Sequence, residues 1–166
     1  MLCWPWMGGC RYNLVMHNLD LFKGIRFFEA FPEDQLVQIL PLTERKAFKE
    51  GEVILEQGHL NLDLFFLLSG SVDVSIDKQF VVTVSSHGQV FGEMSIANHT
   101  TCTATVKAKT DAVMLILNFE ELKSSLKVEN RDGVLKNFYQ ACAEILAKKL
   151  ISTNQIAKTF RAEHGA

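Results

Sequence analysis

The chain has 166 residues, of which 48% are apolar and 22% are charged, a composition typical of a globular protein rather than a disordered one. This length favours a single domain with appended helices, because two ordinary domains would each have too small a core. The formal net charge of −2 provides no general attraction to nucleic acid or to anionic lipid. A DNA-binding role is therefore disfavoured.

The cysteines and the hydropathy indicate where the protein resides. Cysteines stand at positions 3, 10, 102 and 142, without the short paired spacing of a zinc site or a disulfide framework. A reducing compartment fits them best, and we expect a cytoplasmic protein. No apolar run approaches the roughly 20 residues that a membrane-spanning helix requires, so no membrane span is predicted.

Residues 1–18 form a leader with two tryptophans around Pro5 and a Gly-Gly-Cys at positions 8 to 10. It has neither the basic start nor the long apolar stretch of a secretory signal. A start at Met7 would resemble a lipidation signal, but Tyr12 stands where the myristoylation pattern has Ser or Thr. We therefore expect a flexible leader or a packing arm.

Apolar residues recur at helical spacing over residues 19–40, and this spacing predicts two short helices with Pro32 in the first turn of the second. Phe27, Phe28 and Phe31 form an aromatic group that is expected to fill a core. From residue 42 to 117 the period changes to two, with glycines at 51, 58, 70, 88 and 92 between the β-rich segments. Many short strands of this kind predict a mainly β fold, either a barrel or a sandwich.

The helical period returns after residue 117. Asn118 and Glu121 form a capping-box-like start for a helix over residues 119–126. A longer helix is predicted to begin near Asp132 and to run towards Lys158. At 1.5 Å per residue it would span about 40 Å, more than a small β domain is expected to cover.

The apolar stripe on this long helix predicts a homodimer, in which the helices of two copies meet. The same stripe could instead cover the chain's own β domain, and the sequence does not separate the two possibilities. The stripe consists of Leu135, Phe138, Cys142 and Ile145.

Two segments carry a family resemblance: GEVILEQGHLNLDLFFLLSGSVDV from Gly51, and HGQVFGEMSIANHTTCTATVKA from His87. With Phe-Gly-Glu at 91–93 and the glycines at family spacing, the chain resembles the cyclic-nucleotide-binding domain family over roughly residues 19–160. The resemblance implies an eight-stranded jelly-roll β-barrel flanked by N-terminal and C-terminal helices. It divides the chain into a barrel with flanking helices over 19–130, a long C-terminal helix over 131–160, and a tail over 161–166.

The resemblance also implies cAMP or cGMP as the ligand and a phosphate-binding cassette of the form Phe-Gly-Glu, a short helix, then Arg-Ala/Thr-Ala. Glu93 would accept a hydrogen bond from the ribose hydroxyl, or would only hydrogen-bond cassette amides. The amides of Ser95 and Ile96 would donate to the phosphate, because helix N-termini favour anions. The ligand-binding residues implied in this way are Phe91, Gly92, Glu93, Met94, Ser95, Ile96, Cys102, Thr103 and Ala104.

Cys102 stands where the family pattern has its phosphate-binding arginine. A neutral thiol cannot supply the charged hydrogen bonds of a guanidinium. The loss of about 1.5–3 kcal/mol should weaken nucleotide binding roughly ten- to a hundredfold. Thr103 matches the threonine that favours guanine in some members of the family. We expect Cys102 to be a small buried filler rather than a redox-sensing thiol.

The function predicted on these grounds is a non-catalytic regulatory module that binds cAMP and cGMP weakly or not at all and contacts a protein partner in a signalling pathway. The alternative is a functional sensor of a cyclic nucleotide or another small ligand, which the intact Phe-Gly-Glu favours.

No motif combines a nucleophile, a base and an orienting group, so no enzyme is predicted. His59, His87 and His99 lie in different predicted loops, and no metal site or cofactor is expected. Few residues follow Phe160, so no helix-turn-helix is expected.

Overall fold

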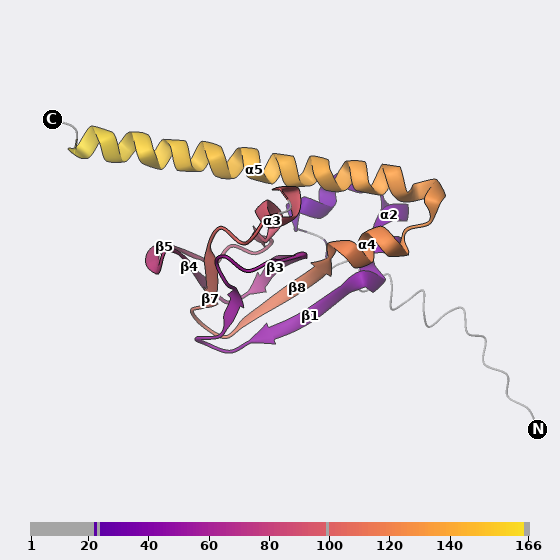
Figure 1. Ribbon diagram of the computed structural model, residues 1–166, viewed down its shortest axis with the longest axis horizontal. Helices are drawn as coiled ribbons and strands as arrows, with labels where there is room; N and C mark the ends of the chain where they lie inside the picture. Colours follow the sequence, from indigo (N-terminus) through magenta and orange to yellow (C-terminus); the bar gives the residue numbers. More distant parts are fainter. Residues whose placement is uncertain (1–21, 23, 99, 165–166) are drawn as a thin grey trace, which may run out of the picture.

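The computed structural model describes residues 22, 24–98 and 100–164, and the predicted leader lies outside them. Short helical segments come first, followed by eight strands, with one helix between the sixth and seventh strands and two helices at the end (Figure 1). The elements are η1 (Arg26–Ala30), α2 (Glu33–Ile39), η2 (Leu40–Leu42), β1 (Thr43–Phe48), β2 (Val53–Leu55), β3 (Asp63–Ser69), β4 (Val72–Ile76), β5 (Gln79–Val84), β6 (Val90–Phe91), α3 (Glu93–Asn98), β7 (Thr105–Ala108), β8 (Ala112–Asn118), α4 (Phe119–Ser125) and α5 (Val128–His164).

The strands form two four-stranded antiparallel sheets with the orders β1-β8-β3-β6 and β2-β7-β4-β5. The mainly β fold with flanking helices is thus confirmed, but the expected closed barrel is wrong. Among the described residues no ladder joins the two sheets, and only an isolated bridge between Leu60 and Thr101 lies outside the strands. The strands β2 and β6 have three and two residues, which leaves too few backbone groups to continue a ladder around a barrel.

One apolar core lies between the two sheets. Phe48 of β1 and Met114 of β8 come from one sheet, whereas Val72 of β4 and Val106 of β7 come from the other, and all four are buried. The predicted alternation in β4 is present at Val72, but it fades along the strand, where Ile76 is 43% exposed. These contacts hold the sheets face to face as a sandwich.

A second core joins the helices to the sheet that contains β3. Phe27 and Phe28 of η1 are buried against Phe66 of β3 and Phe138 of α5. The ring centroid of Phe27 lies 5.2 Å from that of Phe66 and 5.4 Å from that of Phe138. The expectation that the N-terminal phenylalanines fill a core is confirmed, and their partners include the long helix.

The predicted cap of α4 is present, since the side chain of Asn118 accepts a hydrogen bond from the amide of Glu121 at 2.8 Å. The start of the long helix was predicted a turn too late. Helix α5 begins at Val128, because the carbonyl of Lys127 already accepts the amides of Asn130 and Arg131 at 3.1 and 3.0 Å. It continues to His164, past the predicted end.

The apolar stripe of α5 faces the chain's own core. Phe138 and Cys142 are buried there, and Leu135 and Ile145 pack against the same cluster. These four side chains are therefore not available as a seam between two copies in this arrangement, because they already cover η1 and the sheets. The C-terminal part of α5, drawn in yellow, extends beyond the strands (Figure 1). No helix in the described part of the chain is long and apolar enough to cross a membrane.

Candidate functional site

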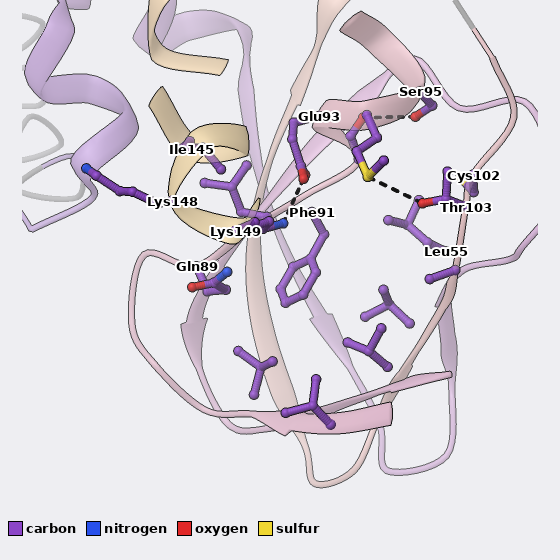
Figure 2. A pocket seen from close by; sticks show the side chains of 18 of the residues that line it. Leu55, Gln89, Phe91, Glu93, Ser95, Cys102, Thr103, Ile145, Lys148 and Lys149 are labelled. Atoms are coloured by element: carbon purple, nitrogen blue, oxygen red, sulfur yellow. Dashed lines mark hydrogen bonds and ion pairs between the residues drawn. The ribbon is translucent and has the colours of Figure 1, made fainter. Parts of the chain in front are cut away.

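A cavity of about 650 Å³ lies between the β2-β7-β4-β5 sheet, the α3 helix and α5 (Figure 2). Its lining includes the residues of the predicted cassette, with the exception of Ile96. The walls are mostly apolar, with Leu55, Val74, Val84, Phe91, Val106 and Ile145 among the lining side chains.

The turn into α3 depends on glycine at position 92. Gly92 has φ of +92°, and a Cβ added there would lie 2.4 Å from the carbonyl oxygen of Asp63 and 2.8 Å from Nδ2 of Asn61. Only a residue without a side chain allows this approach. The side-chain Nδ2 of Asn61 donates to the backbone carbonyl of Asp63 at 2.7 Å and to the hydroxyl of Ser95 at 3.2 Å. The start of α3 is thus fastened to the start of β3, which fixes the position of Glu93.

Glu93 is 2% exposed and carries the one carboxylate among the described residues that line the cavity. Its Oε1 accepts a hydrogen bond from Nζ of Lys149 at 2.7 Å (Figure 2). The same Nζ donates to the carbonyl of Val90 at 2.8 Å and lies 5.5 Å from the ring centroid of Phe91. The structure thus gives Glu93 an ammonium partner from α5 that the sequence did not predict, and its contact with a ribose or with the cassette amides stays a prediction.

Cys102 lies at the cavity wall and is 7% exposed. Burial raises the pKa of its thiol, and a hydrogen bond with the Ser95 side chain opposes that shift. Its backbone is held by hydrogen bonds with the carbonyl of His59 at 2.8 Å and the amide of Gly58 at 2.9 Å. The position that the family pattern gives to arginine is thus occupied by an uncharged thiol on a fixed backbone.

The side chains of the remaining cassette residues contact their own segment or the core. The amide of Ile96 donates to the carbonyl of Gly92 at a long 3.4 Å, and its side chain is buried in the second core. The hydroxyl of Ser95 donates a hydrogen bond to the carbonyl of Gly92 at 2.8 Å. Thr103 Oγ1 contacts Sδ of Met94 at 3.5 Å, and Ala104 lines the cavity with a methyl group. The polar atoms of this segment are mostly engaged within it.

Three cations at the cavity were not predicted from the sequence: Arg26 of η1, and Lys148 and Lys149 of α5. Lys149 continues the buried stripe four residues after Ile145, and that spacing was the available signal. Of the histidines considered in the sequence, His59 and His87 do not converge, and His99 lies outside the described residues. His59 lies 3.2 Å from Glu56 and His87 contacts the carbonyl of Leu68, and no group of metal-binding side chains occurs among the described residues.

Comparison with known proteins relates this geometry to a family. The model of the cyclic nucleotide-binding domain matches residues 45–128, about half of the chain. The chain is 26% identical over 106 residues to a cAMP-dependent protein kinase regulatory subunit of Debaryomyces hansenii, covering 64% of this chain and 24% of that protein. It therefore spans about a quarter of the length of that relative.

Solved structures share the fold. A regulatory domain of Toxoplasma gondii PKA with cAMP superposes with a TM-score of 0.66 and 16% identity, covering 85% of this chain and 51% of that one. The regulatory subunit of a cAMP-independent protein kinase A from Trypanosoma brucei superposes with a TM-score of 0.62 and 23% identity, also covering 85% and 51%. With the matched family model, the two facing sheets and the α3 cassette, this chain belongs to the cyclic nucleotide-binding domain family.

Proposed function

We propose that the protein is a non-catalytic regulatory module that binds cAMP and cGMP weakly or not at all and acts through contacts with other proteins. The observation that carries this proposal is the buried, uncharged Cys102 at the place of the phosphate-binding arginine. A cyclic phosphate placed against α3 would find no counter-charge at that position. The loss is worth about 1.5–3 kcal/mol, or roughly ten- to a hundredfold in affinity.

The ion pair of Glu93 with Lys149 adds to this effect. A ribose hydroxyl that approached Glu93 would compete with an ammonium group that is already 2.7 Å away and is part of the same chain. Such an intramolecular partner acts at a high effective concentration. Two contacts that would hold a cyclic nucleotide are thus weakened. The phosphate contact lacks its arginine at position 102, and the ribose contact at Glu93 competes with Lys149.

A functional sensor remains the second candidate, and a specific observation favours it. The Gly92 turn is intact, and a cavity of about 650 Å³ lies beside it, large enough for a small ligand. The fold itself does not decide between the two, because it is shared by a cAMP complex and by the subunit of a kinase described as cAMP-independent.

A thermal-shift measurement tests the proposal. A receptor with Kd of about 1 μM would gain about 4 kcal/mol at about 1 mM nucleotide. For a chain of this size that gain corresponds to a rise in Tm of roughly 8–16 °C. A site a hundredfold weaker would gain about 1.4 kcal/mol, so we expect a rise of less than about 6 °C with either cAMP or cGMP. A rise in Tm of roughly 8–16 °C would support the functional sensor instead.

The protein contacts that we propose include a homodimer through an exposed face of α5, in a cytoplasmic signalling setting like that suggested by the kinase regulatory relative. Tyr139, Leu146 and Leu150 follow one another at the seven- and four-residue intervals of a helix seam. Tyr139 is 43% and Leu150 is 61% exposed, while the opposite face of this stretch of the helix packs on the chain's own core. These side chains would meet their own copies across a two-fold axis.

Light scattering on the purified protein tests the dimer. We expect a dimer for the unaltered chain and a monomer for Leu150→Glu, because the carboxylate would enter the seam twice. Glu144→Lys is the control, since Glu144 is exposed on the same helix about a third of a turn away. A monomeric unaltered protein, or a dimer that survives Leu150→Glu, would show that this face serves another partner.

A further inference from the structure

The cavity is unequally charged. In the part of the lining that the structure describes, Glu93 is the one acid, whereas Arg26, Lys148 and Lys149 are basic. The pair of Glu93 and Lys149 cancels one charge of each sign, which leaves an excess of positive charge around an apolar cavity. The chain as a whole has a formal net charge of −2, so the excess is a local feature.

Lys149 is the cation with a defined place in the cavity. It points towards Glu93 above the ring of Phe91, whereas Lys148 points the other way (Figure 2). An ammonium group has three donors, and Lys149 uses two of them, for the carbonyl of Val90 and for Glu93. Its side chain is 34% exposed, so the third donor is accessible to a molecule in the cavity.

We propose that the cavity binds an amphiphilic monoanion, a small molecule with an apolar body and one acid group. The acid hydrogen-bonds Lys149, and the apolar body lies against Val74, Val84 and Phe91. Figure 2 shows Lys149 and Cys102 on different sides of the cavity, so this anion does not use the place that the family pattern gives to the phosphate. The inference goes beyond the proposed function, which concerns cAMP and cGMP alone.

An apolar body suits the walls named above. A ribose or a purine has several polar atoms, which need partners when they are buried. Val74, Val84 and Phe91 provide none, and the acceptor Glu93 is already paired, so a polar body would depend on lining residues away from them, such as Gln89 and Thr103. A body without polar atoms leaves no group unsatisfied and still places one charge on Lys149.

Glu93 limits the affinity for an anion. Its carboxylate shares the ammonium group with the ligand and repels the ligand's acid. Replacing Glu93 by glutamine keeps the shape and removes that repulsion, so an anion should then bind more tightly. Replacing Lys149 should have the opposite effect. The two changes thus distinguish a cavity that prefers anions from a cavity that binds any apolar molecule of suitable size.

The experiment compares two fluorescent probes that differ in one charged group, anilinonaphthalene sulfonate and uncharged N-phenylnaphthylamine. Each is titrated into the full chain and into Lys149→Met, Glu93→Gln and the control Lys136→Met, which removes an exposed lysine of α5 that does not line the cavity. We expect Lys149→Met to weaken the sulfonate probe about tenfold and Glu93→Gln to strengthen it severalfold. The uncharged probe should change less than about twofold in these three variants, as should both probes in Lys136→Met. Val84→Trp, which narrows the cavity, should weaken both.

A sulfonate affinity that is the same with and without Lys149 would overturn the proposal, as would an equal change of both probes, which indicates a loosened core. If Lys149→Met does not fold, Glu93→Gln still decides, because a failure to strengthen sulfonate binding also overturns the proposal. Titration of the same samples with cAMP keeps the two proposals apart. Tight cAMP binding contradicts the proposed function. A cavity whose affinity for the sulfonate probe does not depend on Lys149 or Glu93 contradicts only this inference.

Discussion

Replacing Cys102 by arginine restores the cation that the cassette lacks, and the structure allows its effect to be worked out. Cys102 borders a cavity of about 650 Å³, so the longer side chain has space to enter without displacing the core. A guanidinium that hydrogen-bonds a cyclic phosphate is worth about 1.5–3 kcal/mol. We expect the lower end of that range, about a tenfold gain in affinity for cAMP or cGMP, because Glu93 remains paired with Lys149.

Isothermal titration calorimetry on Cys102→Arg and on the unaltered chain measures this gain. Cys102→Gln is the control, because it adds a long polar side chain without charge. The double variant Cys102→Arg with Lys149→Met should bind more tightly again, since Glu93 is then free for the ribose. An arginine variant that folds normally but binds no better than the glutamine control would refute the assignment of Cys102 to the arginine position.

Three further predictions concern the architecture around the site. Gly92→Ala should lower the stability far more than Gly58→Ala in urea titrations, because both glycines have positive φ but only the Cβ at position 92 meets backbone, at 2.4 Å. Equal costs would contradict the close approach of β3. Phe138→Ala should cost about 3–5 kcal/mol in the same assay, because its ring is fully buried between η1 and α4; a cost near zero would mean that α5 is not docked. Burial, with the charge of Glu93, raises the pKa of the Cys142 thiol from 9.0 to about 12. Because the unfolded thiol ionises first, stability should fall as the pH rises from about 9 to 12, and Cys142→Ala should flatten that part of the profile.

Local patterns in the sequence predicted much of the fold. Alternating residues and regularly spaced glycines defined the β region, and Asn118 with Glu121 marked the start of α4. The closure of the sheets could not be predicted, because it depends on hydrogen bonds between edge strands that are distant in sequence. The short β2 and β6 strands leave the two sheets as a sandwich.

The candidate site was predicted on the cassette side and missed on the helix side. Phe91, Gly92 and Glu93 follow a recognisable order, and they do line the cavity. Lys149 lies 56 residues from Glu93, and nothing in the sequence near either residue indicates the pair. The stripe on α5 was visible, but a helix stripe does not say whether it meets its own sheets or a second copy. In the structure the stripe of α5 packs on the aromatic residues of η1, and this packing places Lys149 at the cavity.

The most direct test of the proposed function is a calorimetric titration of the unaltered, nucleotide-free protein with cAMP and with cGMP. The account predicts no saturable heat, or a Kd weaker than about 100 μM, for both nucleotides, because the cassette lacks a cation at Cys102 and Glu93 is already paired. Submicromolar binding of either nucleotide at one molecule per chain would contradict it.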